Sequence, residues 1–129
     1  MINKKGNVLV IGVGSIGKRH ISNFELYFEN IFICDTRQDR LNETIKKFNI
    51  KESFLNYYDA IDNIENLDAV CICTPPNSHL EIAKKTVNKN INLFIEKPLG
   101  MNVEGWQEIS DECNKKQLLN YVAFCHRHI

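Results

Sequence analysis

Three glycines near the N-terminus are spaced in a way that suits phosphate binding. They form Gly12-x-Gly14-x-x-Gly17 directly after a run of branched apolar residues that is typical of a buried strand. A glycine turn from such a strand into a helix leaves the first N–H groups of the helix unpaired. The positive end of the helix dipole then favours a pyrophosphate at this point. The residues that we expect to contact a dinucleotide here are Gly12, Gly14, Ser15 and Ile16.

An acidic residue follows the next apolar run, at the position where the adenosine ribose of a dinucleotide should lie. Ile31–Cys34 reads as a second buried strand, and Asp35 comes directly after it, roughly twenty residues beyond the glycines. Its carboxylate can accept hydrogen bonds from both ribose hydroxyls and would repel a 2′-phosphate, which favours NAD over NADP. Arg37 weakens this argument, because its guanidinium could contact the cofactor and partly neutralise a phosphate. The alternative interpretation is that Asp35 only begins a turn.

Two later segments place polar side chains where further predicted strands end. The first segment follows one strand and holds Thr74, Pro75, Asn77 and His79. The second segment follows the next strand and holds Glu96 and Lys97. His79 is either a core residue on an apolar helical stripe or a neighbour of the nicotinamide ribose, and the residues alone do not decide between these. A lysine in a partly dry cleft can bind a substrate hydroxyl and move protons, so Lys97 is the candidate catalytic residue. The alternative is a surface lysine paired with Glu96.

The elements that must position these residues alternate between strand and helix along the whole chain. One apolar helical stripe holds Gly17, Ile21, Phe24 and Phe28, and a second holds Leu41, Ile45 and Phe48. Such alternation predicts an α/β fold with a doubly wound, mostly parallel six-stranded sheet in the order 3-2-1-4-5-6. In that sheet the strand ends named above meet at one edge, where ligands bind. We expect residues 1–129 to form one domain.

Composition narrows the classes of partner. The chain has 16 basic and 16 acidic residues, and no basic face that would indicate a nucleic-acid partner. It holds no apolar stretch near the roughly 20 residues of a membrane helix and begins with no signal-peptide pattern, so we expect a cytoplasmic protein. The 5 cysteines include no Cys-x-x-Cys pair, and most read as small buried hydrophobes. We therefore expect no metal site.

These motifs together resemble the N-terminal domain of the glucose–fructose oxidoreductase/inositol dehydrogenase/rhizopine-catabolism (Gfo/Idh/MocA) family. The similarity is carried by the segments 12–20, 74–79 and 96–99, in that order and spacing. It implies an NAD(P)-dependent oxidoreductase that transfers a hydride to or from a carbon of a sugar, cyclitol or sugar nucleotide. It also implies that Thr74, Pro75, Asn77 and His79 line the nicotinamide half of the site. Glu96 and Lys97 would lie beside the reacting carbon.

The resemblance also implies what these 129 residues do not contain. Family members continue into a second α/β domain that supplies much of the substrate pocket, so we expect little or no turnover from this chain alone. The alternatives are a non-catalytic nucleotide-binding module or half of a split enzyme that acts with a partner chain, and a homo-oligomer is also possible. The sequence leaves open the roles of His126, Arg127 and His128 and the isomer of the Lys97–Pro98 bond.

Overall fold

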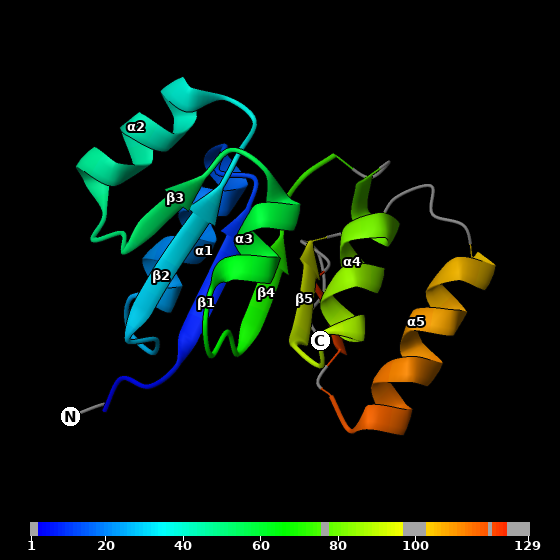
Figure 1. Cartoon of the computed structure of the whole chain (residues 1–129). Helices are drawn as coiled ribbons and strands as arrows, with labels where there is room; N and C mark the ends of the chain where they lie inside the picture. The colour runs from blue at the N-terminus through cyan, green and yellow to red at the C-terminus, as the bar shows by residue number, and fades with distance from the viewer. Residues whose placement is uncertain (1–2, 76–77, 97–102, 119, 124–129) are drawn as a thin grey trace.

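The computed structural model describes residues 3–75, 78–96, 103–118 and 120–123, with side chains described except at 96, 103–106 and 120–123. Strands and helices alternate along the chain (Figure 1). The strands are β1 (Asn7–Ile11), β2 (Asn30–Cys34), β3 (Glu52–Phe54), β4 (Ala69–Ile72), β5 (Asn92–Glu96) and β6 (Asn120–Ala123). The helices are α1 (Ser15–Phe24), α2 (Gln38–Lys47), α3 (Tyr57–Asn63), α4 (His79–Asn88) and α5 (Val103–Lys116).

The six strands form one parallel sheet in the order β3-β2-β1-β4-β5-β6, as predicted from the sequence. The chain order reverses between β1 and β4, since the first three strands run outward in one direction and the last three in the other. The register pairs Ile11 with both Cys34 and Ile72, and Ile72 with Ile95. The carboxyl ends of the four central strands therefore lie at one edge of the sheet, where doubly wound folds bind ligands.

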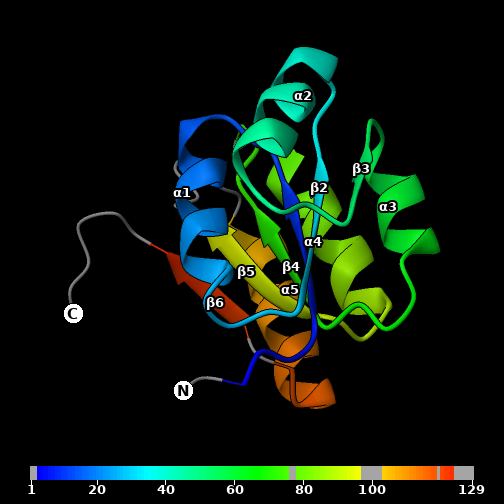
Figure 2. The ribbon, with the colours of Figure 1, turned by 90° about the vertical axis from the view of Figure 1, so that its left-hand side faces the viewer.

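Helices cover both faces of the sheet, so alternate side chains of each central strand enter two separate cores (Figure 2). Val8 and Val10 of β1 pack with buried residues of α1 and α2 on one face. Leu9 and Ile11 pack with residues of α3, α4 and α5 on the other. Burial on both faces explains why the strand sequences are continuously apolar instead of alternating.

Two predicted helical stripes differ from the structure at their ends. Helix α1 ends at Phe24, so Phe28 lies beyond it, although its ring still packs edge-on against Phe24 at 5.4 Å between centroids. In α2 the buried residues are Leu41 and Thr44, and Ile45 is 45% exposed. Thr44 is accommodated because its hydroxyl donates to the backbone oxygen of Arg40, which satisfies the buried polar group.

Candidate cofactor site

The glycine turn is held by backbone contacts that only glycine permits. Gly12 has φ +93°, and a Cβ there would lie 2.8 Å from the carbonyl carbon of Cys73. A Cβ on Gly17 would lie 2.0 Å from the carbonyl oxygen of Gly12, so α1 begins pressed against the turn itself. Gly14 differs from both, because it has an ordinary extended backbone (φ −72°, ψ −160°) and its Cβ would meet only the Arg40 guanidinium, at 3.7 Å. Among the residues that the structure describes, none requires a glycine at position 14.

Asp35 fastens the glycine turn to the end of β2. Its side chain is buried, and Oδ2 accepts a hydrogen bond from the backbone N–H of Val13 at 2.9 Å. Oδ1 accepts from the backbone N–H of Arg37, also at 2.9 Å. A carboxylate has about four lone-pair positions, so these two bonds leave one acceptor position on each oxygen. Asp35 can therefore hold the turn and bind two hydroxyl groups at the same time.

The backbone of the segment after β4 is held in place by the buried side chain of His79. Backbone pairing continues past the strand, since the N–H of Cys73 donates to the oxygen of Ile11 at 2.7 Å. The His79 ring is 1% exposed, and its Nε2 pairs with the backbone oxygen of Thr74. Ser78 stands at the N-cap of α4, but its hydroxyl donates to the backbone oxygen of Pro75 at 3.0 Å instead of capping the helix. Both side chains thus fix the Thr74–Pro75 backbone.

These segments surround a cavity of about 650 Å³ at the carboxyl edge of the sheet. This volume is within the ordinary range for a small-molecule or cofactor site. The wall residues come from the glycine turn, the end of β2, the start of α3 and the segment from β4 into α4. The lining residues are Ile11, Gly12, Gly14, Ser15, Ile16, Gly17, Cys34, Asp35, Thr36, Arg40, Leu55, Asn56, Tyr57, Cys73, Thr74, Pro75, Ser78 and Ile82.

The cavity brings together seven of the residues chosen from the sequence as cofactor contacts: Gly12, Gly14, Ser15, Ile16, Asp35, Thr74 and Pro75. His79 is not in its wall, because this side chain is buried in the interior of the protein, where it contacts the backbone oxygen of Thr74. Asn77 and Lys97 lie outside the described residues, as does the side chain of Glu96. The backbone of Glu96 ends β5, beside the β4 end, so β5 terminates at the same edge of the sheet as the cavity.

Arg37, which the sequence predicted to contact the cofactor, does not line the cavity. Arg40 lines the cavity instead. The Arg37 guanidinium makes two hydrogen bonds to the Asp39 carboxylate, at 2.7 and 3.1 Å, and this pairing raises the pKa of Arg37 and lowers that of Asp39. Arg40 lies in the wall with Nη1 3.8 Å from Asp35 Oδ2. Arg37 is the extended N-cap residue that precedes α2, whereas Arg40 lies within the first turn of the helix, so the two side chains leave the backbone in different directions.

Sequence reasoning also missed the wall contributed by the start of α3. Asn56 caps this helix, since its side-chain oxygen accepts from the N–H groups of Tyr58 and Asp59 at 2.8 and 3.3 Å. The cap fixes the direction of Leu55, Asn56 and Tyr57, which all line the cavity. An Asn followed by an apolar helical pattern is the signal that could have located this cap.

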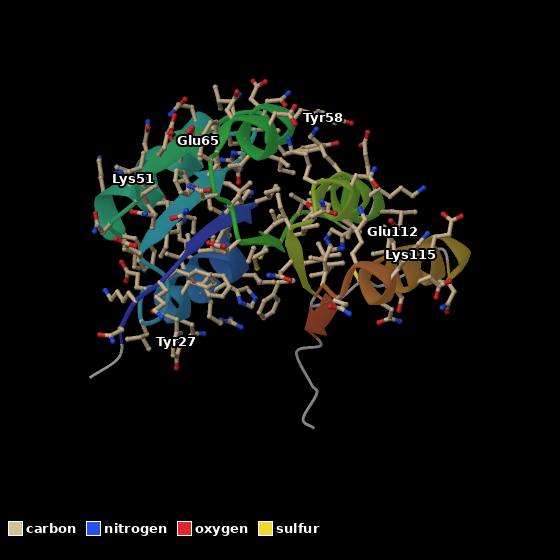
Figure 3. All side chains as sticks on the ribbon, turned by 60° about the horizontal axis from the view of Figure 1, so that its bottom comes forward. Tyr27, Lys51, Tyr58, Glu65, Glu112 and Lys115 are labelled. Atoms are coloured by element: carbon tan, nitrogen blue, oxygen red, sulfur yellow. The ribbon has the colours of Figure 1, made fainter. Side chains whose placement is uncertain are left out.

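Two ionisable groups in the wall are kept neutral. Burial raises the pKa of the Cys34 thiol to about 12, with a smaller contribution from the neighbouring charge of Asp35. Burial also raises the pKa of Tyr57, helped by hydrogen bonding to Tyr58 and Glu81. Tyr58 itself lies on the outer surface of α3 and donates to Glu81 at 2.7 Å (Figure 3). The acidic and basic side chains in the described wall are those of Asp35 and Arg40.

None of the described helices is both long and apolar enough to cross a membrane.

Known proteins resemble this chain both in sequence and in fold. A myo-inositol 2-dehydrogenase of Thermotoga maritima is 30% identical over 120 residues, covering 92% of this chain and 36% of that protein. The crystal structure of a probable dehydrogenase from the same organism superposes with a TM-score of 0.81 at 28% identity, covering 91% of this chain and 35% of its own.

A scyllo-inositol dehydrogenase of Lactobacillus casei, crystallised with NAD(H) and scyllo-inositol, has the same fold with a TM-score of 0.81 at 22% identity. The match covers 93% of this chain and 36% of that dehydrogenase. The chain thus spans about a third of the length of the relatives it matches. A family model described as "Oxidoreductase family, NAD-binding Rossmann fold" matches residues 6–124. The chain therefore belongs to the Gfo/Idh/MocA oxidoreductase family and forms its NAD-binding Rossmann domain.

Proposed function

We propose that this chain supplies the cofactor half of a dehydrogenase that transfers a hydride between NAD and a carbon of a sugar, cyclitol or sugar nucleotide. The observation that carries the proposal is the shared cavity, in which the glycine turn, Asp35 and the Thr74 turn face one another at the carboxyl edge of the sheet. A dinucleotide needs a site for the adenosine ribose, then one for the pyrophosphate, then one for the nicotinamide, and the ends of β2, β1 and β4 offer them in that order across the switch point.

In this proposal the pyrophosphate rests on the glycine turn. The N–H groups at the start of α1 face the cavity, and the first helical hydrogen bond forms only at Lys18, whose N–H donates to the oxygen of Gly14 at 3.0 Å. The N–H groups of Ser15 and Ile16 are thus available to phosphate oxygens, and the open side of Gly14 leaves room for close approach.

The adenosine ribose is assigned to Asp35. Each of its carboxylate oxygens has one backbone partner and keeps an acceptor position for a hydroxyl. A 2′-phosphate would meet this buried negative charge, which supports NAD over NADP. Arg40 lies within reach of the same position and is proposed to contact the adenosine portion of the cofactor. The paired guanidinium of Arg37 is not assigned a contact.

The nicotinamide half is assigned to Thr74 and Pro75, and Asn77 is retained from the sequence motif. His79 is proposed as a positioning residue, because its ring holds the Thr74 carbonyl from within the core. Lys97 is proposed to contact the substrate hydroxyl, with Glu96 beside it. Support for this assignment comes from the family motif and from the end of β5 at the same edge as the cavity.

The substrate class rests on the relatives, which are named as dehydrogenases of inositols. We further propose that residues 1–129 form a single cofactor-binding domain. Most substrate contacts would then come from polypeptide outside these residues or from a partner or second copy of the chain. A cytoplasmic location is proposed as well, supported by Cys34, Cys71 and Cys113, which pack in the apolar cores in the manner of small reduced hydrophobes.

Titration with the reduced cofactors tests the central claim. The purified chain should bind NADH saturably, measured by nicotinamide fluorescence and by calorimetry, and more tightly than NADPH. Asp35→Asn removes the negative charge and leaves one backbone N–H without its carboxylate acceptor. The affinity for NADH should therefore fall, and the ratio of NADH affinity to NADPH affinity should become smaller. The assignment fails if neither cofactor binds saturably, or if the wild-type chain prefers NADPH.

A further inference from the structure

Three potential metal ligands from separate parts of the sequence meet beside the cofactor cavity. His20 lies on α1, Cys71 lies in β4, and Cys73 follows that strand. Their ligand atoms all lie within 4.8 Å of one another. Cys71 and Cys73 are two residues apart in extended backbone, so both thiols point to the α1 face of the sheet. His20 comes from the helix that covers this face.

The two sulfur atoms already have the spacing of a metal-bound pair. They are 3.7 Å apart. Two thiolates bound to one tetrahedral zinc ion at about 2.3 Å would lie about 3.8 Å from each other. An imidazole nitrogen on the same ion would lie about 3.6 Å from each sulfur, so the third ligand, which lies within 4.8 Å of both, needs to approach by at most about 1.2 Å. A rotation of the His20 side chain can provide such a shift, because this residue is only partly buried.

The surroundings orient the imidazole and leave a route for an ion. The His20 ring packs against two aromatic rings, with centroids 5.9 Å from Phe24 and 5.8 Å from Phe94. Cys71 is fully buried, whereas Cys73 is partly exposed and lines the cofactor cavity. An ion can therefore enter from the cavity, and three protein ligands leave one coordination position open, as in zinc sites that bind water or a further ligand.

We propose that His20, Cys71 and Cys73 form a binding site for a thiophilic d¹⁰ cation, of which Zn²⁺ is the biological representative. Two thiolates and one imidazole match the ligand preference of such an ion and neutralise its charge. The site does not depend on the proposed dehydrogenase function, because none of the three residues is assigned a contact with NAD. Sequence spacing did not predict it, since the third ligand comes from a helix more than fifty residues before the cysteines.

A second buried cysteine provides a matched control. Cys34 also lies at the end of a central strand and also lines the cavity, but it is not part of this cluster. Cys34 packs in the core on the opposite face of the sheet from Cys71, so its thiol lies away from His20. Its removal should therefore leave metal binding unchanged.

The experiment is a titration of the folded chain with Cd²⁺, which reports thiolate ligation through charge-transfer absorption in the ultraviolet. Cys125→Ser serves as the background, because that cysteine lies outside the described residues. One equivalent of Cd²⁺ should bind, Zn²⁺ should displace it, and Zn²⁺ should raise the melting temperature by binding the native state. The absorption should be lost in the Cys71→Ala/Cys73→Ala variant and retained in Cys34→Ala.

His20→Phe isolates the third ligand. It keeps an aromatic ring against Phe24 and Phe94 and removes the nitrogen, so Cd²⁺ affinity should fall at least about tenfold, as it does on loss of even an outer-shell partner. Circular dichroism checks the fold of each variant. A test that needs no substitution uses the unmodified chain, in which Zn²⁺ should protect one pair of thiols from a thiol-modifying reagent. Equal Cd²⁺ binding in the double variant, or equal loss in Cys34→Ala, would overturn the proposal.

Discussion

The open side of Gly14 leads to a prediction that separates cofactor binding from folding. Gly14→Ala introduces a Cβ at an extended backbone position, where the substituted residue meets only the Arg40 guanidinium at 3.7 Å. An alanine fits there without strain and reduces the entropy of the unfolded chain. Because Gly14 is the N-cap residue of α1, where alanine is less favourable than glycine, part of this gain is offset, and the free energy of unfolding should change by less than about 1 kcal/mol.

The same methyl group should weaken the binding of NADH. It projects into the cavity, at the place assigned to the pyrophosphate. If it prevents one charge-assisted hydrogen bond between phosphate and backbone, the loss is about 1.5–3 kcal/mol. That corresponds to a decrease in affinity of about tenfold to a hundredfold. The substitution should thus weaken NADH binding while leaving the stability of the fold close to that of the wild type.

Gly17→Ala is the matched comparison. Its Cβ would lie 2.0 Å from the Gly12 oxygen, so the backbone must move, and we expect a loss of about 3 kcal/mol in the free energy of unfolding. Urea titrations followed by circular dichroism measure stability, and NADH fluorescence measures affinity. Wild-type NADH affinity in Gly14→Ala would refute the pyrophosphate assignment. A loss of stability in Gly14→Ala as large as that in Gly17→Ala would refute the interpretation of its surroundings as open.

Three further predictions concern the cavity wall. Arg40→Ala should weaken NADH binding severalfold in fluorescence titrations, and Arg37→Ala should not, since Arg37 pairs with Asp39 outside the cavity; equal effects would contradict the assignment. Asn56→Ala should lower the free energy of unfolding by about 1 kcal/mol in urea titrations, because two N–H groups of α3 lose their acceptor. Cys34 should make the chain less stable at alkaline pH. Its raised pKa gives stability that is complete below the unfolded-chain value of 9.0 and is lost as pH rises toward about 12. Over that range the wild-type chain should lose about 1.4 kcal/mol per pH unit more than Cys34→Ala, and parallel pH profiles would contradict the burial argument.

The sequence by itself determined the order of strands and helices, the sheet topology and the position of the glycine turn. These follow from local patterns: branched apolar runs form buried strands, and helical stripes carry the connections between them. Gly12 could be recognised because a sharp turn from strand to helix needs its backbone conformation. Asp35 could be located because a parallel sheet with right-handed crossovers places the ends of β1 and β2 side by side.

Only the tertiary structure decided which side chains face the cavity. Arg40 lines it in place of Arg37, since Arg37 is the extended residue that precedes α2 and Arg40 lies within the first turn of that helix. His79 packs in the core, where it holds the Thr74 carbonyl. The meeting of His20 with Cys71 and Cys73 depends on where α1 packs on the face of the sheet that carries the two cysteines. Such distances are set by packing between elements far apart in the chain, and no spacing within the sequence encodes them directly.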